Sequence, residues 1–376
     1  MEDYNYGDCF RREESSSSRP RRLVSHFRPS YNEALLTPTF GEDDCGDANA
    51  SIFPCATFMT KAGIQDDFIS LVTRCGLLDY MADESPQFSL LTKTFVESFK
   101  FNNRMFSPTI DFKIYDKTYS LPLEKFCEIL GVKNKGSTKK ISGLPADLLG
   151  LYRELSNDDG RDTHRGKIRN LQLPAIRYFV YYLCTNVLGR GNTSNISHYQ
   201  LAFLDAALNN NTKYNLGAIV ARRLAARGPI YGGTIASRVL AHLNLHARPN
   251  DVPLAPRRLD LAAMKHHNFV TSSSTLDIMC YKILFNDDTE RGVPLPQPIL
   301  FSIDRKPRSR SKEEWDAELV STNYYVVPEE EPPYAEYTTY NVGASSSAYQ
   351  DEEASSSYQG GHDSWGAWTP APPQWP

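Results

Sequence analysis

The stretch Tyr119-Ser-Leu-Pro-Leu-Glu-Lys-Phe-Cys-Glu-Ile-Leu-Gly-Val132 decides the fold class of this chain. Its apolar residues recur at helical spacing, which predicts a helix with one buried face. Pro122 suits the first position of that helix, and Gly131 suits a left-handed residue at its end. The preceding segment, Ile110-Asp-Phe-Lys-Ile-Tyr115, alternates as a half-buried strand does, and it predicts a small β-hairpin near residues 99–120.

Further helices are expected along the chain on either side of this stretch. The strongest starts at Pro174 and ends at Gly189, because its apolar residues keep a helical period throughout. The other expected helices and one late strand cover about Pro145–Leu155, His198–Leu208, Leu216–Ala226, Ile235–Leu243, Leu259–Lys265 and, for the strand, Leu276–Phe285. We therefore predict a mainly α fold, a helical array with a small β-hairpin, flanked by disordered N- and C-terminal arms.

Composition divides the chain of 376 residues into three parts. Residues 1–60 form a basic, Ser-rich arm without sustained periodicity, residues 61–290 form the helical domain, and residues 291–376 form an acidic, aromatic tail, so both arms are expected to be disordered. The net charge of −4 conceals an asymmetry. Residues 161–258 carry fourteen Lys and Arg against three acids, whereas residues 313–376 carry twelve acids and no Lys or Arg.

The basic middle region suits binding of RNA or DNA, because phosphate contacts come mainly from Lys and Arg. The alternative is that these side chains are solvated and keep the protein soluble. The candidate nucleic-acid-binding residues are Arg165, Lys167, Arg169, Arg222, Arg223, Arg227, Arg238, Arg257 and Arg258. Arg223 and Arg227 fall within the apolar arc of their helix, so they either pair with Asp205 or face a subunit or nucleic acid.

Two segments outside the helical domain also invite a functional interpretation. Arg305, Lys306, Arg308, Arg310 and Lys312 resemble a nuclear-import or RNA-contacting patch, although such patches also arise by chance in disordered tails. The acidic tail is either a solvating extension or an interaction segment that meets the basic body of a neighbouring copy.

Catalytic, cofactor and metal sites receive no support from the sequence. Phosphate-binding glycine loops and the Gly-x-Ser-x-Gly elbow are missing, and Asp287-Asp288 is typical of a turn. The adjacent histidines His266 and His267 lack cysteine companions at zinc spacing. We predict no catalytic residue, no metal, no cofactor, no small-molecule substrate and no membrane span. The scattered, odd number of cysteines predicts a reducing intracellular compartment, nucleus or cytoplasm.

A family resemblance rests on several segments that follow one another in a fixed order. They are Phe112–Gly131, Leu173–Phe179, Leu188–Gly191, Leu204–Asn209 and Tyr231–Ile235. Together they resemble the first-open-reading-frame, Gag-like protein of Athila-type, Gypsy-class plant retrotransposons, related to the putative plant transposon protein domain. The resemblance covers roughly residues 60–290.

This resemblance implies a non-enzymatic module of a transposable element that serves particle assembly or RNA packaging, and it carries over no catalytic residue. A Gag polyprotein often ends in a Cys-x-x-Cys-x4-His-x4-Cys zinc knuckle, which this chain does not contain, so RNA packaging would fall to its arginine-rich segments. We expect self-association and nucleic-acid binding. Two alternatives stay open: a domesticated nuclear adaptor similar to the plant mobile domain, acting in silencing or development, and an enzyme with a cryptic site.

Overall fold

The computed structural model describes residues 50–103, 107–156, 166–189, 194–226, 232–272, 278–285, 289–304 and 310–320. The helices are α1 (Ala56–Ala62), α2 (Gln65–Arg74), α3 (Leu78–Ala82), α4 (Ser89–Ser98), α5 (Leu123–Leu130), α6 (Ala146–Leu155), α7 (Pro174–Tyr182), α8 (His198–Asn209), α9 (Leu216–Ala225), α10 (Gly233–His242), α11 (Leu261–His266) and α12 (Lys312–Val320). The strands are β1 (Ile52–Pro54), β2 (Gln87–Phe88), β3 (Lys100–Asn102), β4 (Thr109–Ile114), β5 (Lys117–Pro122), β6 (Pro253–Leu254), β7 (Arg257–Leu259), β8 (Val270–Ser272), β9 (Met279–Leu284) and β10 (Glu290–Pro294).

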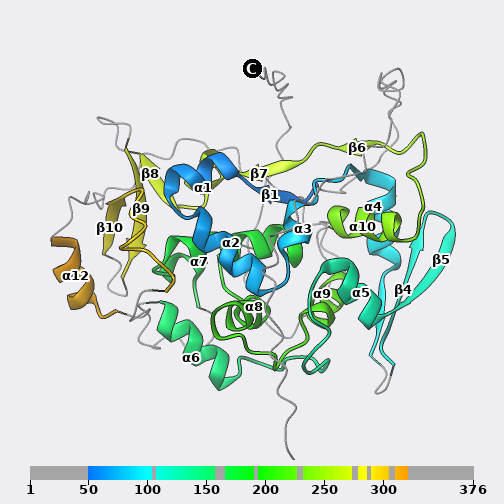
Figure 1. Ribbon diagram of the computed structural model, residues 1–376, viewed down its shortest axis with the longest axis horizontal. Helices are drawn as coiled ribbons and strands as arrows, with labels where there is room; N and C mark the ends of the chain where they lie inside the picture. Colours follow the sequence, from blue (N-terminus) through cyan, green and yellow to red (C-terminus); the bar gives the residue numbers. More distant parts are fainter. Residues whose placement is uncertain are drawn as a thin grey trace, which may run out of the picture. The chain divides into compact units, whose positions relative to one another are not determined.

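Helices fill the centre of the folded part (Figure 1). Helix α2 packs against α7 and α8, and α8 also contacts α6 and α9. Every residue of α7 is buried, and the helix continues as a short π-helical turn, Leu183–Val187. The ring of Phe68 on α2 meets the rings of Tyr178, Phe179 and Tyr182 on α7 edge-on. This aromatic contact joins the two helices, because ring edges carry positive and ring faces negative charge.

The antiparallel sheet β3-β4-β5 lies at one side of these helices, on the right in Figure 1. Its inner face packs on α4 and α5, where the Phe112 ring lies 5.1 Å from that of Phe95. The loop before β6 fixes the start of α4, since the Asp251 carboxylate accepts hydrogen bonds from the backbone N–H groups of Leu90 and Leu91. A carboxylate at a helix N-terminus satisfies donors that the helix itself leaves open.

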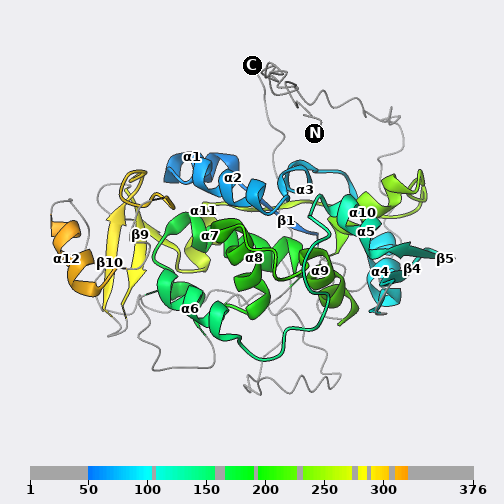
Figure 2. The same ribbon diagram turned by 60° about the horizontal axis from the view of Figure 1, so that its bottom comes forward.

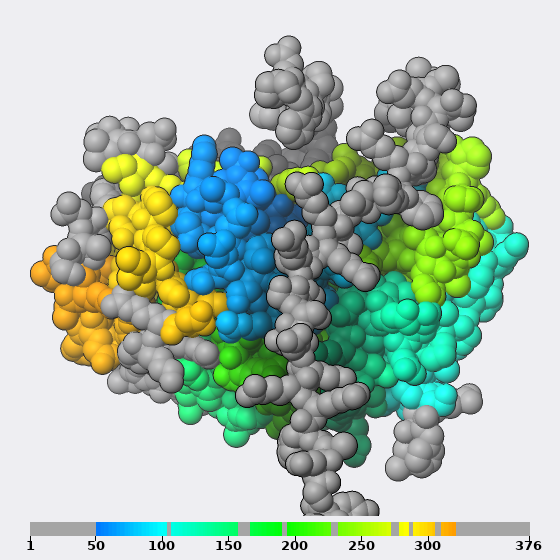
Figure 3. Space-filling view, viewed as in Figure 1, coloured from blue at the N-terminus to red at the C-terminus, as the bar shows by residue number. Residues whose placement is uncertain are grey.

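A second antiparallel sheet, with strand order β10-β9-β8, lies at the opposite side. Helix α12 lies beside it, as the orange and yellow surfaces show in Figure 3. Trp315 of α12 is fully buried, lies 6.0 Å from the Phe301 ring and donates a hydrogen bond to the Gln172 side chain. The chain from 310 to 320 is therefore part of the folded core.

The predicted fold class was wrong, because the chain is a mixed α/β protein. Of the described residues, 48% are helical and 19% lie in strands, which form four small sheets where one hairpin was expected. Strands β1 and β7 pair in parallel, and β2 pairs with β6, across more than 150 residues of sequence. Strands of two or three residues cannot display an alternating pattern, so periodicity does not reveal them.

The hairpin and most helices were predicted correctly. Strands β4 and β5 form the hairpin, and Gly131 ends α5 with a φ of +82°. A Cβ at Gly131 would collide with the backbone oxygen of Gly76, so this position needs glycine both for its dihedral angle and for the close approach of two chain segments. None of the helices in the described ranges is both long and apolar enough to cross a lipid bilayer.

Candidate nucleic-acid interface

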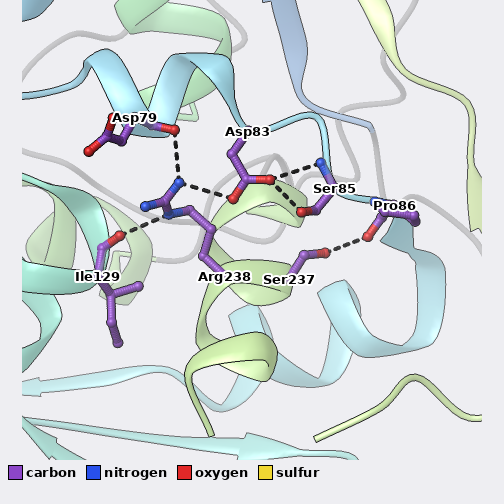
Figure 4. Close-up of polar contacts among 7 residues, drawn as sticks. All are labelled: Asp79, Asp83, Ser85, Pro86, Ile129, Ser237 and Arg238. Carbon is purple, nitrogen blue, oxygen red and sulfur yellow. Dashed lines mark hydrogen bonds and ion pairs between the residues drawn. The ribbon is translucent and has the colours of Figure 1, made fainter. Parts of the chain in front are cut away.

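Arg238 on α10 is held by protein groups on three sides (Figure 4). Its Nε donates to the Ile129 carbonyl at 2.8 Å, and Nη1 donates to the Asp79 carbonyl and the Asp83 carboxylate, both at 3.0 Å. The guanidinium also lies 5.7 Å from the centre of the Tyr80 ring. Arg238 therefore joins α10 to α3 and to the end of α5.

The contacts around Arg238 fix the segment that follows α3. The Asp83 carboxylate accepts hydrogen bonds from the backbone N–H and the hydroxyl of Ser85. Ser237, the neighbour of Arg238, donates to the Pro86 carbonyl at 2.7 Å. With an exposed fraction of 17%, the Arg238 side chain has limited access to a phosphate from solvent.

An open hollow of about 270 Å³ lies beside Arg238. Its lining consists of Asp83, Glu128, Ile129, Arg238, Ala241 and His242. The lining holds two carboxylates and one guanidinium, so the hollow has no excess positive charge that would select an anion.

Arg258 on β7 forms a two-pronged ion pair. Its Nη1 and Nη2 donate to the two carboxylate oxygens of Glu84 at 2.7 and 2.6 Å, and the hydrogen bond to Glu84 raises the pKa of the guanidinium. Nη1 also reaches the Pro54 carbonyl. The adjacent Arg257 is exposed and pairs through its backbone with Ile52. Arg258 thus ties β7 to the chain after α3.

Arg222 and Arg223, on α9, are half-buried. The Arg222 guanidinium lies 5.1 Å from the centre of the Phe101 ring and donates to the Thr138 carbonyl, and burial lowers its pKa. Arg223 Nε donates to the Leu188 carbonyl at 3.5 Å. Both side chains contribute to packing between helices and loops.

Asp205 contacts two amides at the end of its own helix. Asn209 and Asn211 donate to its carboxylate oxygens at 2.9 and 2.7 Å, and these are the contacts of this carboxylate within the described ranges. An internal pair between Asp205 and Arg223 is therefore not formed. Arg227, the other half of that prediction, lies outside the described residues.

The three other candidate residues of the basic middle region are exposed or lie outside the described part. Lys167 and Arg169 are exposed beside the 3-10 turn Ile168–Asn170, and the backbone of Lys167 forms a β-bridge with Asn195. Arg165 lies outside the described residues.

Of the five residues of the nuclear-import-like patch, two lie in the described part of the chain and three lie outside it. Arg310 has a side chain only 5% exposed, forms an ion pair with Glu318 and lies 4.4 Å from the Trp315 ring centre. Lys312 lies over the Phe285 ring at 5.9 Å. Both are engaged by the folded domain. The other patch residues, which lie outside the described ranges, are Arg305, Lys306 and Arg308.

A different cationic surface is open, in the segment between α5 and α6, residues 131–145, which we call the lysine loop (Figure 2). It holds four lysines and no acid, and the four are Lys133, Lys135, Lys139 and Lys140. All four are exposed, and within the described ranges none of their ammonium groups contacts a protein partner. The loop therefore presents a net charge of +4 to solvent.

The backbone of the lysine loop is fixed although its side chains are free. Ser137 pairs with the chain before α9, donating its N–H to the Lys213 carbonyl at 2.8 Å and accepting from the Asn215 N–H at 3.1 Å. The Asn215 side chain donates to that of Asn134 at 2.8 Å. Gly136 has a φ of +92° and leaves no space for a Cβ beside this chain. The four charges are thus carried on an ordered support.

The acids that flank the lysine loop are already paired. Glu128 accepts from Lys125 at 2.8 Å, and Asp147 accepts from Lys213 at 2.7 Å. These hydrogen bonds lower the pKa of both carboxyl groups. Because both acids have their own lysine partner, they do not neutralise the loop.

The histidine pair after α11 has a structural environment. The His267 ring stacks on that of Tyr181 at 4.7 Å, and burial lowers its pKa to about 4. Among the described residues no group of three or more His, Cys, Asp or Glu side chains is placed to hold a metal ion.

Together these features define a mixed α/β protein with an ordered cationic loop. Residues 48–216, just under half of the chain, match the model of the ATHILA ORF-1 family. This match supports an Athila-type retrotransposon ORF1 domain in that region, and it confirms over the same range the resemblance seen in the sequence. The matched range contains the lysine loop but ends at the first residue of α9. No curated protein and no solved structure matches the chain.

Proposed function

We propose that this retrotransposon-associated protein is a non-enzymatic, Gag-like component that binds nucleic acid through the lysine loop and self-associates. The observation that carries the proposal is the set of four exposed lysines without protein partners on an ordered backbone. The arginines of α9, α10 and β7 act differently in this proposal, since Arg222, Arg238 and Arg258 hold the fold together.

Lysine is suited to phosphate binding as a compact point charge on a flexible stem. Its ammonium adapts to the spacing of the phosphates, while the fixed backbone keeps the four stems close in space. The lysine loop contains no aromatic residue on which a base could stack. We therefore expect contacts to the phosphate backbone without preference for base sequence.

A non-enzymatic role is supported by where the titratable groups with perturbed pKa lie. Burial raises the pKa of Cys127 and of Tyr281 to about 12, and both side chains are packed in the core. Catalytic groups with shifted pKa values usually gather in an accessible cleft. For Cys127 and Tyr281 the shifts follow from packing.

The test measures binding of a fluorescent single-stranded RNA of mixed sequence to the full chain. Four phosphate contacts predict a slope of about −2.8 in log K against log salt, or ~50-fold weaker binding between 0.05 and 0.2 M salt. Replacing all four loop lysines by glutamine should remove most of that slope. The replaced residues are Lys133, Lys135, Lys139 and Lys140.

A matched control separates the effect of the lysine loop on RNA binding from the effect of the total charge. Four other exposed lysines, dispersed over α1, β3, β5 and α11, are replaced by glutamine with the same change in net charge, namely Lys61, Lys100, Lys117 and Lys265. We expect this control to bind RNA within about twofold of the wild type, because dispersed charges do not act on the same phosphates. Equal loss in both variants would contradict a role for the lysine loop.

Self-association is tested separately, by light scattering of the full chain with and without RNA. We expect a larger assembly when RNA is present, since one strand can bring several copies together. A particle mass that equals one chain under both conditions would refute this part of the proposal.

A further inference from the structure

The charge of the C-terminal tail complements that of the lysine loop. Residues 321–376 contain eight acids and no Lys or Arg, and six of the acids form two clusters, Glu329–Glu331 and Asp351–Glu353. The loop contains four lysines and no acid. Segments of opposite sign attract each other strongly only where the charges are concentrated and not already paired. Both conditions hold for the loop.

We infer that the tail, residues 321–376 of the same chain, occupies the lysine loop and competes with nucleic acid for it. The inference rests on the proposed function in one respect, since competition requires that nucleic acid binds there. The contact between tail and loop itself does not depend on RNA.

Because the tail is covalently connected to the domain that carries the lysine loop, it is favoured over other occupants of the loop. The described part of the chain ends at Val320, whose side chain is exposed, so the tail is attached at the surface. The acidic clusters follow nine to thirty-three residues later, within a covalent reach of up to about 30 and 110 Å. A folded unit of ~270 residues has a radius of gyration of about 18 Å, so the second cluster can reach any face of it. A tethered segment acts at an effective concentration in the millimolar range.

Three arginines of the described part compete poorly for the tail because they are already paired, and the other exposed lysines are dispersed over several elements. Arg238, Arg258 and Arg310 already have carboxylate partners at Asp83, Glu84 and Glu318, respectively. A carboxylate of the tail would have to displace these pairs, whereas at the lysine loop it displaces only water and counterions.

The first experiment compares RNA binding by the full chain and by a full-length variant with the six clustered tail acids replaced by amides. The substitutions are Glu329→Gln, Glu330→Gln, Glu331→Gln, Asp351→Asn, Glu352→Gln and Glu353→Gln. If the tail covers the loop about four-fifths of the time, the apparent Kd at low salt tightens about fivefold in this variant. The gain should vanish near 0.2 M salt, where such contacts are screened.

The lysine-loop variant tests whether this gain in RNA affinity arises at the lysine loop. In the chain that lacks the four loop lysines, the tail substitutions should leave RNA binding unchanged, whereas in the dispersed-lysine control the fivefold gain should persist. An equal gain in all three backgrounds would mean general repulsion of RNA by the tail and would overturn the inference.

The second experiment detects the contact without RNA. A carbodiimide joins a lysine to a carboxylate that it touches, and mass spectrometry should find peptides that link Lys133, Lys135, Lys139 or Lys140 to the tail clusters. An equal mixture of ¹⁴N- and ¹⁵N-labelled chains identifies the source of the tail. Links confined to one isotope support the inference, whereas mixed-isotope links as frequent as same-isotope links would show that a second copy supplies the tail and would overturn it.

The two experiments distinguish the two ideas. Weaker RNA binding by the loop variant, together with no effect of the tail substitutions and no cross-links, would leave the proposed function standing and reject the tail contact. Cross-links within one chain, with RNA binding that ignores the loop lysines, would confirm the contact and reject the proposed function.

Discussion

Replacing Arg177 by methionine should destabilise the protein strongly, because this buried cation donates to four carbonyl groups, of which the Arg169 carbonyl is the most distant at 3.5 Å and the other three dominate. The Arg177 side chain is 1% exposed and extends from α7 toward β9 and the end of α11. Nη1 donates to the Lys282 carbonyl at 3.1 Å, and Nη2 donates to the carbonyls of Asn268 and His267 at 2.8 and 3.3 Å. The guanidinium also faces three aromatic rings.

The size of the loss in the free energy of unfolding follows from the hydrogen bonds that methionine cannot make. Methionine fills similar space but donates no hydrogen bond, so three buried acceptors lose a charged donor, at about 1–3 kcal/mol each. Removal of the charge returns part of this, because a buried guanidinium carries its own desolvation cost. We expect a net loss of about 3–5 kcal/mol, which is the range for removing one member of a buried charged network. The cation also lies at the C-terminal end of α11, where positive charge is favourable.

The assay is urea unfolding followed by tryptophan fluorescence, with Arg153→Met as the control. Arg153 is exposed on α6, and its replacement should change the free energy of unfolding by less than about 0.5 kcal/mol. Arg177→Lys should give an intermediate loss, since one ammonium cannot reach all three carbonyls in the geometry of the guanidinium fork. If Arg177→Met unfolds at the same urea concentration as the wild type, the carbonyls do not depend on the guanidinium and the reasoning fails.

Three further predictions concern the backbone, a helix cap and the response to pH. Gly131→Ala should cost about 1–3 kcal/mol in thermal or urea unfolding, because a φ of +82° and the contact with Gly76 exclude a side chain, whereas Gly150→Ala, in open space within α6, should stabilise by about 0.5–1 kcal/mol. Asp251→Ala should cost about 1–3 kcal/mol by leaving the start of α4 without its acceptor, and hydrogen exchange at the first turn of α4 should accelerate. His267 has a pKa of about 4 in the folded chain and 6.5 as its ordinary value, so the unfolded state takes up the proton first, and stability falls as pH drops from 6.5 toward 4. His267→Phe should reduce that fall by up to about 3 kcal/mol, and an unchanged pH profile would contradict this assignment.

The helices could be predicted because each carries its own signal. Pro174 marks the start of α7, Ser197 caps α8 together with Gln200, and Gly131 ends α5. The short sheets depend instead on segments that meet only in the folded chain, such as β1 with β7. Strand β10 includes Glu290, Gly292 and Pro294, whose composition is closer to that of a turn than of a strand.

The cationic residues show a similar limit of sequence reasoning. The sequence shows that Arg223 falls on an apolar face, but it does not show the backbone carbonyl of Leu188 that accepts its hydrogen bond. Likewise, Asp83 and Glu84, which pair with Arg238 and Arg258, lie more than 150 residues away in sequence. The lysine loop is visible as a run of lysines without acids, yet only the structure shows that the two flanking acids are already paired.

Arginine and lysine side chains have different roles in this protein because their charged groups differ in chemistry. A guanidinium presents five donors in a rigid plane and stacks on aromatic rings, so one side chain can serve several acceptors at once, as Arg177 and Arg238 do. An ammonium is strongly hydrated and gains less from burial, so lysines stay at the surface unless a carboxylate holds them, as Glu290 holds Lys282, whose side chain is 16% exposed. A count of positive charges along the sequence adds these two populations together. Because Arg177, Arg222, Arg238 and Arg258 are engaged in packing, we propose that the polyanion-binding charge of the described part is concentrated in the lysine loop, where the acidic tail would compete for it.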